Sequence, residues 1–143
     1  MKLGAYKLDQ RAVIPEFKTA QAACFDIVAI GREIIGGNAV YSTGLALEIP
    51  DGYCVEVYSR SGHGFRDDLR LSNCVGIIDA DYTGEIKVKM AYDGPSFLTA
   101  EWPWVNERVA QAKLVKLVKT EIVEVYEQKE TERGTGGFGS TGK

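Results

Sequence analysis

Short stretches in which every second residue is hydrophobic recur along most of the chain. In "GEIKVKM", Ile86, Val88 and Met90 alternate with polar residues, as in a strand with one buried face. The run "VYSTGLALEIP" ends at a Pro-Asp-Gly turn signal, residues 50–52, and the alternating run "YCVEVYS" follows it. Short strands separated by glycines and turn residues predict an all-β fold, either a sandwich or a barrel.

One stretch, "ERVAQAKLVKLVKTEIVEVYE", carries two conflicting patterns. Val115, Val118, Ile122 and Val125 fall at helical spacing, which predicts an amphipathic helix. The same run is rich in β-branched residues and ends in the alternating "EIVEVYE", which predicts a strand. Periodicity leaves both interpretations open for this stretch.

Composition narrows the class of protein. The 143 residues suit one domain, running to about residue 128 and followed by a glycine-rich tail at 129–143. A formal charge of −3 argues against nucleic-acid binding, which needs a basic surface. Three widely spaced cysteines without a C-x-x-C pair argue against zinc and disulfides and predict a reducing cytoplasm. We expect no membrane span, because no apolar run reaches the required length.

The segment "SRSGHGFRDDLRLSN" is the first candidate for chemistry. Arg60, Ser61 and Gly62 are expected near the start of a helical turn, where a guanidinium, a hydroxyl and close backbone amides suit a phosphate. The alternative is an ordinary helix cap formed by Ser61. The lone histidine, His63, has no sequence partner that predicts catalysis.

The segment "NCVGIIDADYTGEIKVK" is the second candidate. In an extended backbone Asp79 and Asp81 point to the same side, where close carboxylates alter each other's proton affinity. One interpretation makes Asp79 a general base beside Tyr82, whose ring packs on a substrate. The other is a β-hairpin turn with solvated acids.

Three further features have both structural and functional interpretations. Asp26 interrupts the apolar run "AACFDIVA", so we expect a partner such as an arginine. Trp102 and Trp104, in the irregular "GPSFLTAEWPWVNE", are expected to pack against a neighbouring surface. The tail "RGTGGFGSTGK" is either a flexible end or a lid that orders on a ligand with a ring and phosphates.

Five segments, in chain order, carry a family resemblance: "AACFDIVA", "RSG", "GIIDADYTGEI", "ERVAQ" and "RGTGGFGSTG". Together they resemble the five motifs of the trimeric dUTP nucleotidohydrolases (dUTPases), over about residues 22–142. The resemblance implies a jelly-roll homotrimer with shared active sites, a flexible C-terminal arm that closes over a neighbour's site, and strands rather than helix at 108–126.

The resemblance also implies a reaction, the hydrolysis of dUTP to dUMP and pyrophosphate. Asp79 would activate the water, Tyr82 would pack under the deoxyribose, and Mg²⁺ would be held mainly by the triphosphate and waters. Asp26 is a possible contact to the metal's waters. The implied substrate-binding residues are Arg60, Ser61, Gly62, Asn73, Gly76, Ile77, Ile78, Tyr82, Lys87, Gln111, Arg133, Phe138, Gly139, Ser140 and Thr141.

The chain departs from the family pattern in several places. Cys24 stands where glycine is common, "HGFRDD" follows the arginine motif, and the segment with the two tryptophans is longer than usual. Two alternatives therefore stay open beside dUTP hydrolysis: a dCTP deaminase-like enzyme, and a regulatory protein that senses dUTP.

Overall fold

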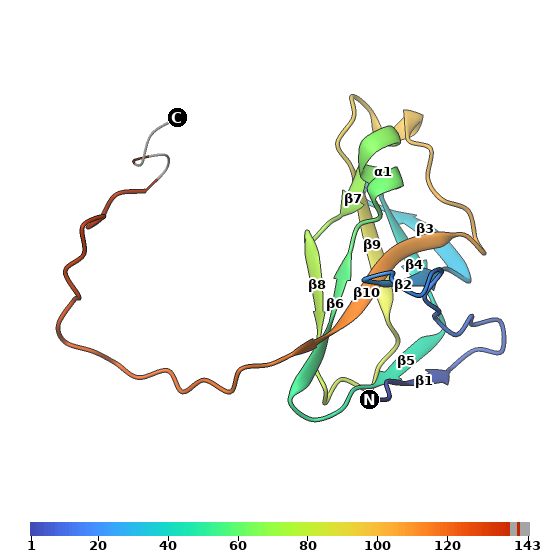
Figure 1. The fold of residues 1–143 in the computed structure, drawn as a ribbon. Helices are drawn as coiled ribbons and strands as arrows, with labels where there is room; N and C mark the ends of the chain where they lie inside the picture. Colours follow the sequence, from blue (N-terminus) through green and yellow to red (C-terminus); the bar gives the residue numbers. More distant parts are fainter. Residues whose placement is uncertain (138–139, 141–143) are drawn as a thin grey trace.

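The computed structural model describes residues 1–137 and 140, and their fold is almost entirely antiparallel β-sheet (Figure 1). Two four-stranded sheets have the strand orders β2-β10-β6-β8 and β3-β4-β9-β7, and β1 pairs with β5. The strands are β1 (Gly4–Lys7), β2 (Phe25–Val28), β3 (Gly31–Ile35), β4 (Asn38–Ser42), β5 (Leu45–Glu48), β6 (Tyr53–Tyr58), β7 (Leu69–Leu71), β8 (Val75–Ile78), β9 (Lys87–Tyr92) and β10 (Arg108–Lys116), with the helix α1 (Ser61–Arg66) and the 3-10 turn η1 (Phe97–Thr99).

Apolar side chains between the two sheets form the core. Val55, Leu69 and Met90 are fully buried, and the alternating residues of β9 behave as predicted, with Val88 inside and the lysines outside. A strand with one buried face needs this period of two, because successive side chains point to opposite faces. The all-β prediction is confirmed.

The turn prediction at residues 50–52 is also confirmed, since the Tyr53 amide donates to the Pro50 carbonyl over 3.2 Å. Gly52 has a φ of +79°, a backbone angle that suits glycine. In the part of the chain that the structure describes, no helix is long and apolar enough to cross a membrane.

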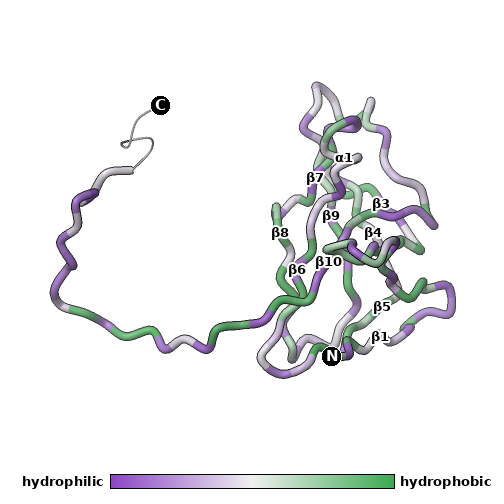
Figure 2. Tube along the Cα trace, in the orientation of Figure 1, coloured by the Kyte–Doolittle hydropathy of each residue, from purple (hydrophilic) through white to green (hydrophobic). Residues whose placement is uncertain are grey.

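The helix interpretation of the ambiguous stretch is wrong. Residues 108–116 form β10, the long strand between β2 and β6, because pairing on both sides favours its β-branched residues. The strand expectation is also wrong beyond Lys116, since residues 117–126 are neither strand nor helix. Figure 1 shows this segment leaving the body formed by the β-sheets, which we call the barrel. Figure 2 shows that the segment alternates between apolar and polar residues.

The segment between β8 and β9 is not the β-hairpin that the sequence suggested. β8 pairs with β6, whereas β9 pairs with β4 and β7 in the other sheet. Residues 79–86 therefore cross from one sheet to the other, and we call them the β8–β9 connection.

The tryptophan segment lies against the barrel as predicted for Trp102, which is partly buried and meets Tyr92 edge-on, with ring centroids 6.3 Å apart. Trp104 is 68% exposed, and the Arg32 guanidinium lies 4.7 Å from its ring centroid. The buried Tyr41 hydroxyl donates to the Pro103 carbonyl over 2.9 Å and fastens the segment to β4. The prediction that both tryptophans pack against a neighbouring surface thus holds for Trp102, whereas Trp104 is largely exposed.

Candidate active site

Asp26, Arg60, Arg108 and Gln111 form a cluster that we call the phosphate corner. Asp26 on β2 lies opposite Gln111 on β10, and its two carboxylate oxygens pair with Arg60 Nε at 3.3 Å and Arg108 Nη1 at 3.1 Å. The Gln111 amide donates to the Ser59 carbonyl over 2.9 Å. The expectation that Asp26 has arginine partners is confirmed, and the pairing holds two guanidiniums side by side.

A β-bulge in β10 shapes this corner. The pairing between β10 and β2 shifts between Arg108 and Ala110, and the consecutive residues Val109 and Ala110 are both buried. A bulge adds one residue and re-aims the side chains on either side of it. The side chains of Arg108 and Gln111, three residues apart, can therefore both point to the same face of the sheet.

Arg60, Ser61 and Gly62 lie at the start of α1, as predicted. The cap position is Arg60, with extended backbone angles, and no side chain of the described residues caps the helix. The interpretation of Ser61 as an ordinary helix cap is therefore wrong, because Ser61 is the first residue inside the helix. Its side chain is exposed at the edge of the phosphate corner.

A cavity of about 320 Å³ lies beside β8, and we call it the base pocket. Val57, Asn73 and Lys87 line it together with the glycine and two isoleucines of β8, Gly76, Ile77 and Ile78. A Cβ on Gly76 would meet Val57 Cβ at 3.2 Å and Asn73 Nδ2 at 3.7 Å. The absence of a side chain at residue 76 thus keeps this pocket open.

Asp79 and Tyr82 line a second cavity, of about 510 Å³, that shares Ile77, Ile78 and Lys87 with the base pocket. The Tyr82 amide donates to the Asp79 carbonyl over 3.2 Å, so the chain turns directly after β8. The extended arrangement of Asp79 and Asp81 is therefore wrong. Asp79 itself is exposed where it lines this cavity.

One chain does not bring Asp79 to the phosphate corner. β6 and β8 are antiparallel, with Val55 opposite Ile78 and Tyr58 opposite Val75. Asp79 follows one end of this ladder and Arg60 follows the other, and the three residue steps between Val55 and Tyr58 alone span about 10 Å. The two halves of the predicted site lie at opposite ends of β6.

The sequence drew attention to one of two buried polar residues near these cavities, the lone histidine His63, but not to the other, Ser72. Ser72 Oγ, beside the base pocket, and His63 Nδ1, beside the phosphate corner, have no hydrogen-bond partner among the described residues. Burial, followed by the nearby Arg60 charge, lowers the pKa of His63 from its ordinary value. Alternating patterns cannot find such atoms, because unmet hydrogen bonding depends on tertiary neighbours.

Figure 1 shows residues 129–137 leading away from the two sheets, and no residue of this described stretch lines either cavity. The Arg133 guanidinium donates to the nearby Gly136 carbonyl over 2.9 Å, and the Ser140 amide donates to the Gly137 carbonyl over 3.1 Å. Of the other predicted tail residues, Phe138, Gly139 and Thr141 lie outside the described residues.

Metal binding by the protein alone would need several donor side chains close together. Among residues 1–137 and 140, no group of three or more His, Cys, Asp or Glu side chains could hold a metal. Asp26 is the carboxylate that pairs with the arginines of the phosphate corner, and both its oxygens face guanidinium groups. This arrangement suits a Mg²⁺ ion that takes most of its ligands from phosphates and water, as Mg²⁺ usually does.

Comparison with known proteins gives a consistent result. Residues 10–142 match the dUTPase family. The deoxyuridine 5'-triphosphate nucleotidohydrolase of Nautilia profundicola is 45% identical over 100% of both chains, and that of Wolinella succinogenes is 39% identical over 100% of this chain and 95% of its own. The structure of Staphylococcus bacteriophage 80alpha dUTPase with dUPNHPP is similar at a TM-score of 0.84 and 26% identity, covering 99% of each chain. These matches give no support to the deaminase or the dUTP-sensing alternative.

Proposed function

Since the chain belongs to the dUTPase family, we infer that it hydrolyses dUTP to dUMP and pyrophosphate, and we propose that Asp79 directs the attacking water. The observation that carries this assignment is that Asp79 and Tyr82 line a cavity directly adjoining the base pocket. A base bound beside β8 would place its sugar at Tyr82 and its first phosphate near Asp79.

In this mechanism the Asp79 carboxylate accepts a proton from water while the water oxygen bonds to the α-phosphorus. The bond from the α-phosphorus to the bridging oxygen breaks, and pyrophosphate leaves with that electron pair. Orienting the water and removing its proton contributes about 10²–10⁴-fold for a general base. Because Asp79 is held at a turn and not on a free end, its aim at the phosphorus is set before substrate binds.

We assign uracil recognition to Asn73 and to the backbone of residues 76–78. The narrow space beside Gly76, where even one added Cβ would be crowded, would reject the methyl group of thymine. Tyr82 is assigned to the face of the deoxyribose, where its ring would exclude a 2′-hydroxyl. Ser72 Oγ, unpartnered beside Asn73, is a further candidate hydrogen-bond donor in this pocket.

The phosphate corner receives the leaving pyrophosphate in this proposal. Arg60 neutralises phosphate charge, while Gln111, the exposed Ser61 and the adjacent Gly62 align the phosphates by hydrogen bonding. Asp26 keeps Arg60 in place through its ion pair. Lys87, which lines both cavities beside Asp79, adds a cation near the first phosphate. Arg133, Ser140 and Thr141 of the tail complete the phosphate contacts, and Phe138 stacks on uracil, with Gly139 allowing close approach.

A Mg²⁺ ion bound to the triphosphate would neutralise phosphate charge and orient the pyrophosphate leaving group. The residue of this chain that would reach the ion's waters is Asp26. Its side chain is 15% exposed, so part of the carboxylate faces solvent while the arginines hold it. We propose no direct protein ligand to the metal.

We propose that the enzyme is a homotrimer with active sites shared between subunits. Two features support this assembly. Asp79 and Arg60 follow opposite ends of the β6–β8 ladder, so substrate meets both most simply when they come from different subunits. In addition, Val118, Ile122, Val125 and Tyr126 are each at least 73% exposed along the segment after β10, and burial against a neighbour would remove this apolar surface from water.

We place the enzyme in the cytoplasm. Cys24, Cys54 and Cys74 are all free in the structure. Thiols persist in a reducing compartment and tend to oxidise outside it.

A pyrophosphate-release assay with dUTP, dTTP, dCTP and UTP tests the function and the role of Asp79. Wild type should turn over dUTP alone, and Asp79→Asn should lower kcat by at least about 100-fold, the scale of a general base. Asp81→Asn is the matched control, since Asp81 does not line either cavity. Equal turnover of dTTP, or an active Asp79→Asn variant, would contradict the proposal.

A further inference from the structure

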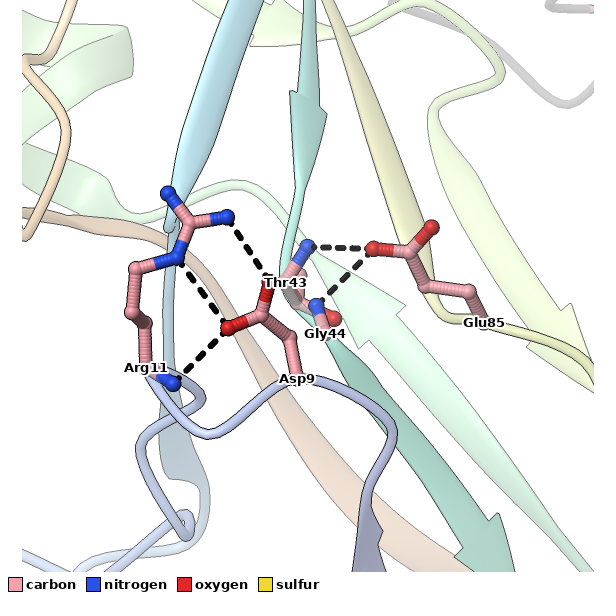
Figure 3. A network of polar contacts seen from close by, with 5 residues as sticks. All are labelled: Asp9, Arg11, Thr43, Gly44 and Glu85. Carbon is pink, nitrogen blue, oxygen red and sulfur yellow. Dashed lines mark hydrogen bonds and ion pairs between the residues drawn. The ribbon is translucent and has the colours of Figure 1, made fainter.

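The carboxylate of Glu85 reaches from the β8–β9 connection to the backbone of the loop between β4 and β5. Its Oε1 atom accepts hydrogen bonds from the Thr43 amide at 3.1 Å and the Gly44 amide at 2.8 Å (Figure 3). Hydrogen bonds from backbone N–H to an ionised carboxylate are stronger than those between neutral groups. Glu85 thus joins the catalytic connection to a loop that is 41 residues away in sequence.

The loop that receives Glu85 is itself held firmly. Gly44 has a φ of +63°, and a Cβ there would lie 2.6 Å from Ile30 Cδ1 and 2.9 Å from Asp9 Cβ. The Gly44 carbonyl accepts from the Leu8 amide at 2.7 Å. Figure 3 shows Asp9, which Arg11 holds through two guanidinium contacts, on the other side of this loop. Glu85 is therefore hydrogen-bonded to a loop whose backbone is fixed by tight packing.

The next residue along strengthens the same junction. The fully buried Thr43 hydroxyl donates to the Ile86 carbonyl at 2.6 Å, and the Ile86 amide donates to the Leu45 carbonyl at 2.8 Å. These bonds would keep Ile86 in place without Glu85. The Glu85 side chain is then the contact that fixes the position of the backbone between Ile86 and the preceding residues Tyr82 and Asp79.

From Glu85 the contacts continue to Asp79. The Tyr82 hydroxyl donates to the Glu85 carbonyl at 2.9 Å, and the Tyr82 amide donates to the Asp79 carbonyl at 3.2 Å. Gly84 lies under the Tyr82 ring, where a Cβ would come within 2.6 Å of the hydroxyl oxygen. A change in the position of residue 85 would accordingly be passed to both Tyr82 and Asp79.

We propose that Glu85 is a positioning residue for hydrolysis, whose carboxylate anchors the β8–β9 connection and thereby aims Asp79 at the attacking water. The inference rests on the role of Asp79 given above. Glu85 lines the cavity of Asp79, but its Oε1 oxygen is occupied by the two amides. Its other oxygen lies 3.8 Å from Lys87 Nζ, a weaker contact that provides a second, separable effect.

The test compares Glu85→Ala with Glu85→Gln in single-turnover and steady-state dUTP hydrolysis. Loss of the anchor should lower kcat by about 10–100-fold with KM changed less than about threefold, because misplacement by 1 Å costs up to about 100-fold. Glutamine keeps an acceptor oxygen for the two amides and should restore kcat to within about threefold of wild type. Glu48→Ala is the control, since it removes an exposed carboxylate bound to Tyr6 in the β1–β5 sheet.

Hydrogen exchange supplies a readout that does not depend on activity. Amides of residues 79–82 should exchange faster in Glu85→Ala, while those of β6 and β10 stay at wild-type rates. If Glu85→Ala does not fold, Glu85→Asp gives the same comparison, because it keeps the charge but shortens the reach by one methylene. Glu85→Asp should then show the same loss of kcat and the same faster exchange.

Three results would overturn the proposal: wild-type kcat in Glu85→Ala, unchanged exchange at residues 79–82, or a Glu85→Gln variant as slow as Glu85→Ala. The last result would assign the effect to the charge near Lys87 and not to the anchor. An active Asp79→Asn variant would instead refute the role of Asp79, and faster exchange in Glu85→Ala would still show that the carboxylate anchors the connection.

Discussion

The phosphate corner and the C-terminal tail are assigned to the same phosphates but are held in opposite ways. In the corner, Asp26 pairs with two arginines, and a β-bulge aims Arg108 before any substrate is present. In the tail, the Arg133 guanidinium donates to the Gly136 carbonyl, three residues further along the same exposed segment. The corner is ready in advance and loses little entropy on binding, whereas the tail must lose chain entropy when it closes. The difference predicts that changes in the tail affect activity alone, while changes in the corner affect both activity and stability.

The largest effect is expected from a chain that ends at Glu132, before Arg133. Removing a single donor to the charge that develops in the transition state costs about 10²–10³-fold in kcat, so loss of the donors assigned to the tail should lower dUTP turnover by at least about 100-fold. The Tm should stay within about a degree of wild type, because the described contacts of Arg133 and Ser140 are with Gly136 and Gly137 of the removed segment itself. Pyrophosphate release and differential scanning calorimetry measure the two quantities. A fully active truncated chain, or one with a clearly lower Tm, would contradict the comparison.

Gly76→Ala should narrow the base pocket on the side that faces Val57 of β6. The added Cβ meets Val57 Cβ at 3.2 Å, so the neighbour must move by a few tenths of an ångström and the pocket shrinks. We expect KM for dUTP to rise by about 10-fold, the lower end of what one methylene costs in a pocket. Gly64→Ala in α1 is the control, since its Cβ meets only the Leu69 carbonyl oxygen at 3.9 Å. Steady-state kinetics would refute the pocket assignment if both variants had the same KM.

Asp26→Asn should weaken the phosphate corner without changing its shape. Arg60 would lose a charged partner while its side chain is still only 24% exposed, so its orientation over the phosphates should loosen. We expect KM for dUTP to rise by about fivefold and the Tm to fall. Asp93→Asn is the matched control, because Asp93 pairs with Arg70 at 2.7 Å on an exposed part of the surface, where ion pairs contribute little. Equal behaviour of the two variants would show that the Asp26 pairs do not organise the site.

His63→Leu should change the response of the barrel to pH, the smallest of these effects. Burial lowers the pKa of His63 from its ordinary value of 6.5, so near that pH the unfolded chain binds more protons than the folded one. The stability that neutral His63 contributes is therefore fully present above pH 6.5 and is lost as the pH falls below that value. The drop in urea midpoint between about pH 7.5 and pH 5.5 should be smaller in His63→Leu. An identical drop in both proteins would show that His63 titrates normally in the fold.

Local pattern was enough to predict several parts of this protein. Alternation in β9 identified which residues face the core, and the turn signal at 50–52 ended β5 correctly. The order of the motifs identified the dUTPase family, and the family match spans residues 10–142. Each of these features lies in residues that are neighbours in sequence, so their chemistry can be read directly from it.

Other parts depended on which strands become neighbours. The ambiguous stretch is β10 up to Lys116 because β2 and β6 pair with it on both sides, and beyond that residue no strand within the described residues pairs with it. The β8–β9 connection resembled a hairpin in sequence, but its two strands belong to different sheets. Periodicity shows that a segment is extended, and it does not show which strand it will pair with.

By itself the sequence determined the strand-forming segments, the chemical groups at Arg60, Asp79 and the tail, and the family to which they belong. The tertiary structure decided that Asp26 pairs with two arginines and that Asp79 and Arg60 lie beyond opposite ends of the β6–β8 ladder. It also decided that Glu85 accepts hydrogen bonds from the β4–β5 loop. The physical reason is that such contacts join residues tens of positions apart. Their geometry follows from register, bulges and sheet crossings, which only the folded chain sets.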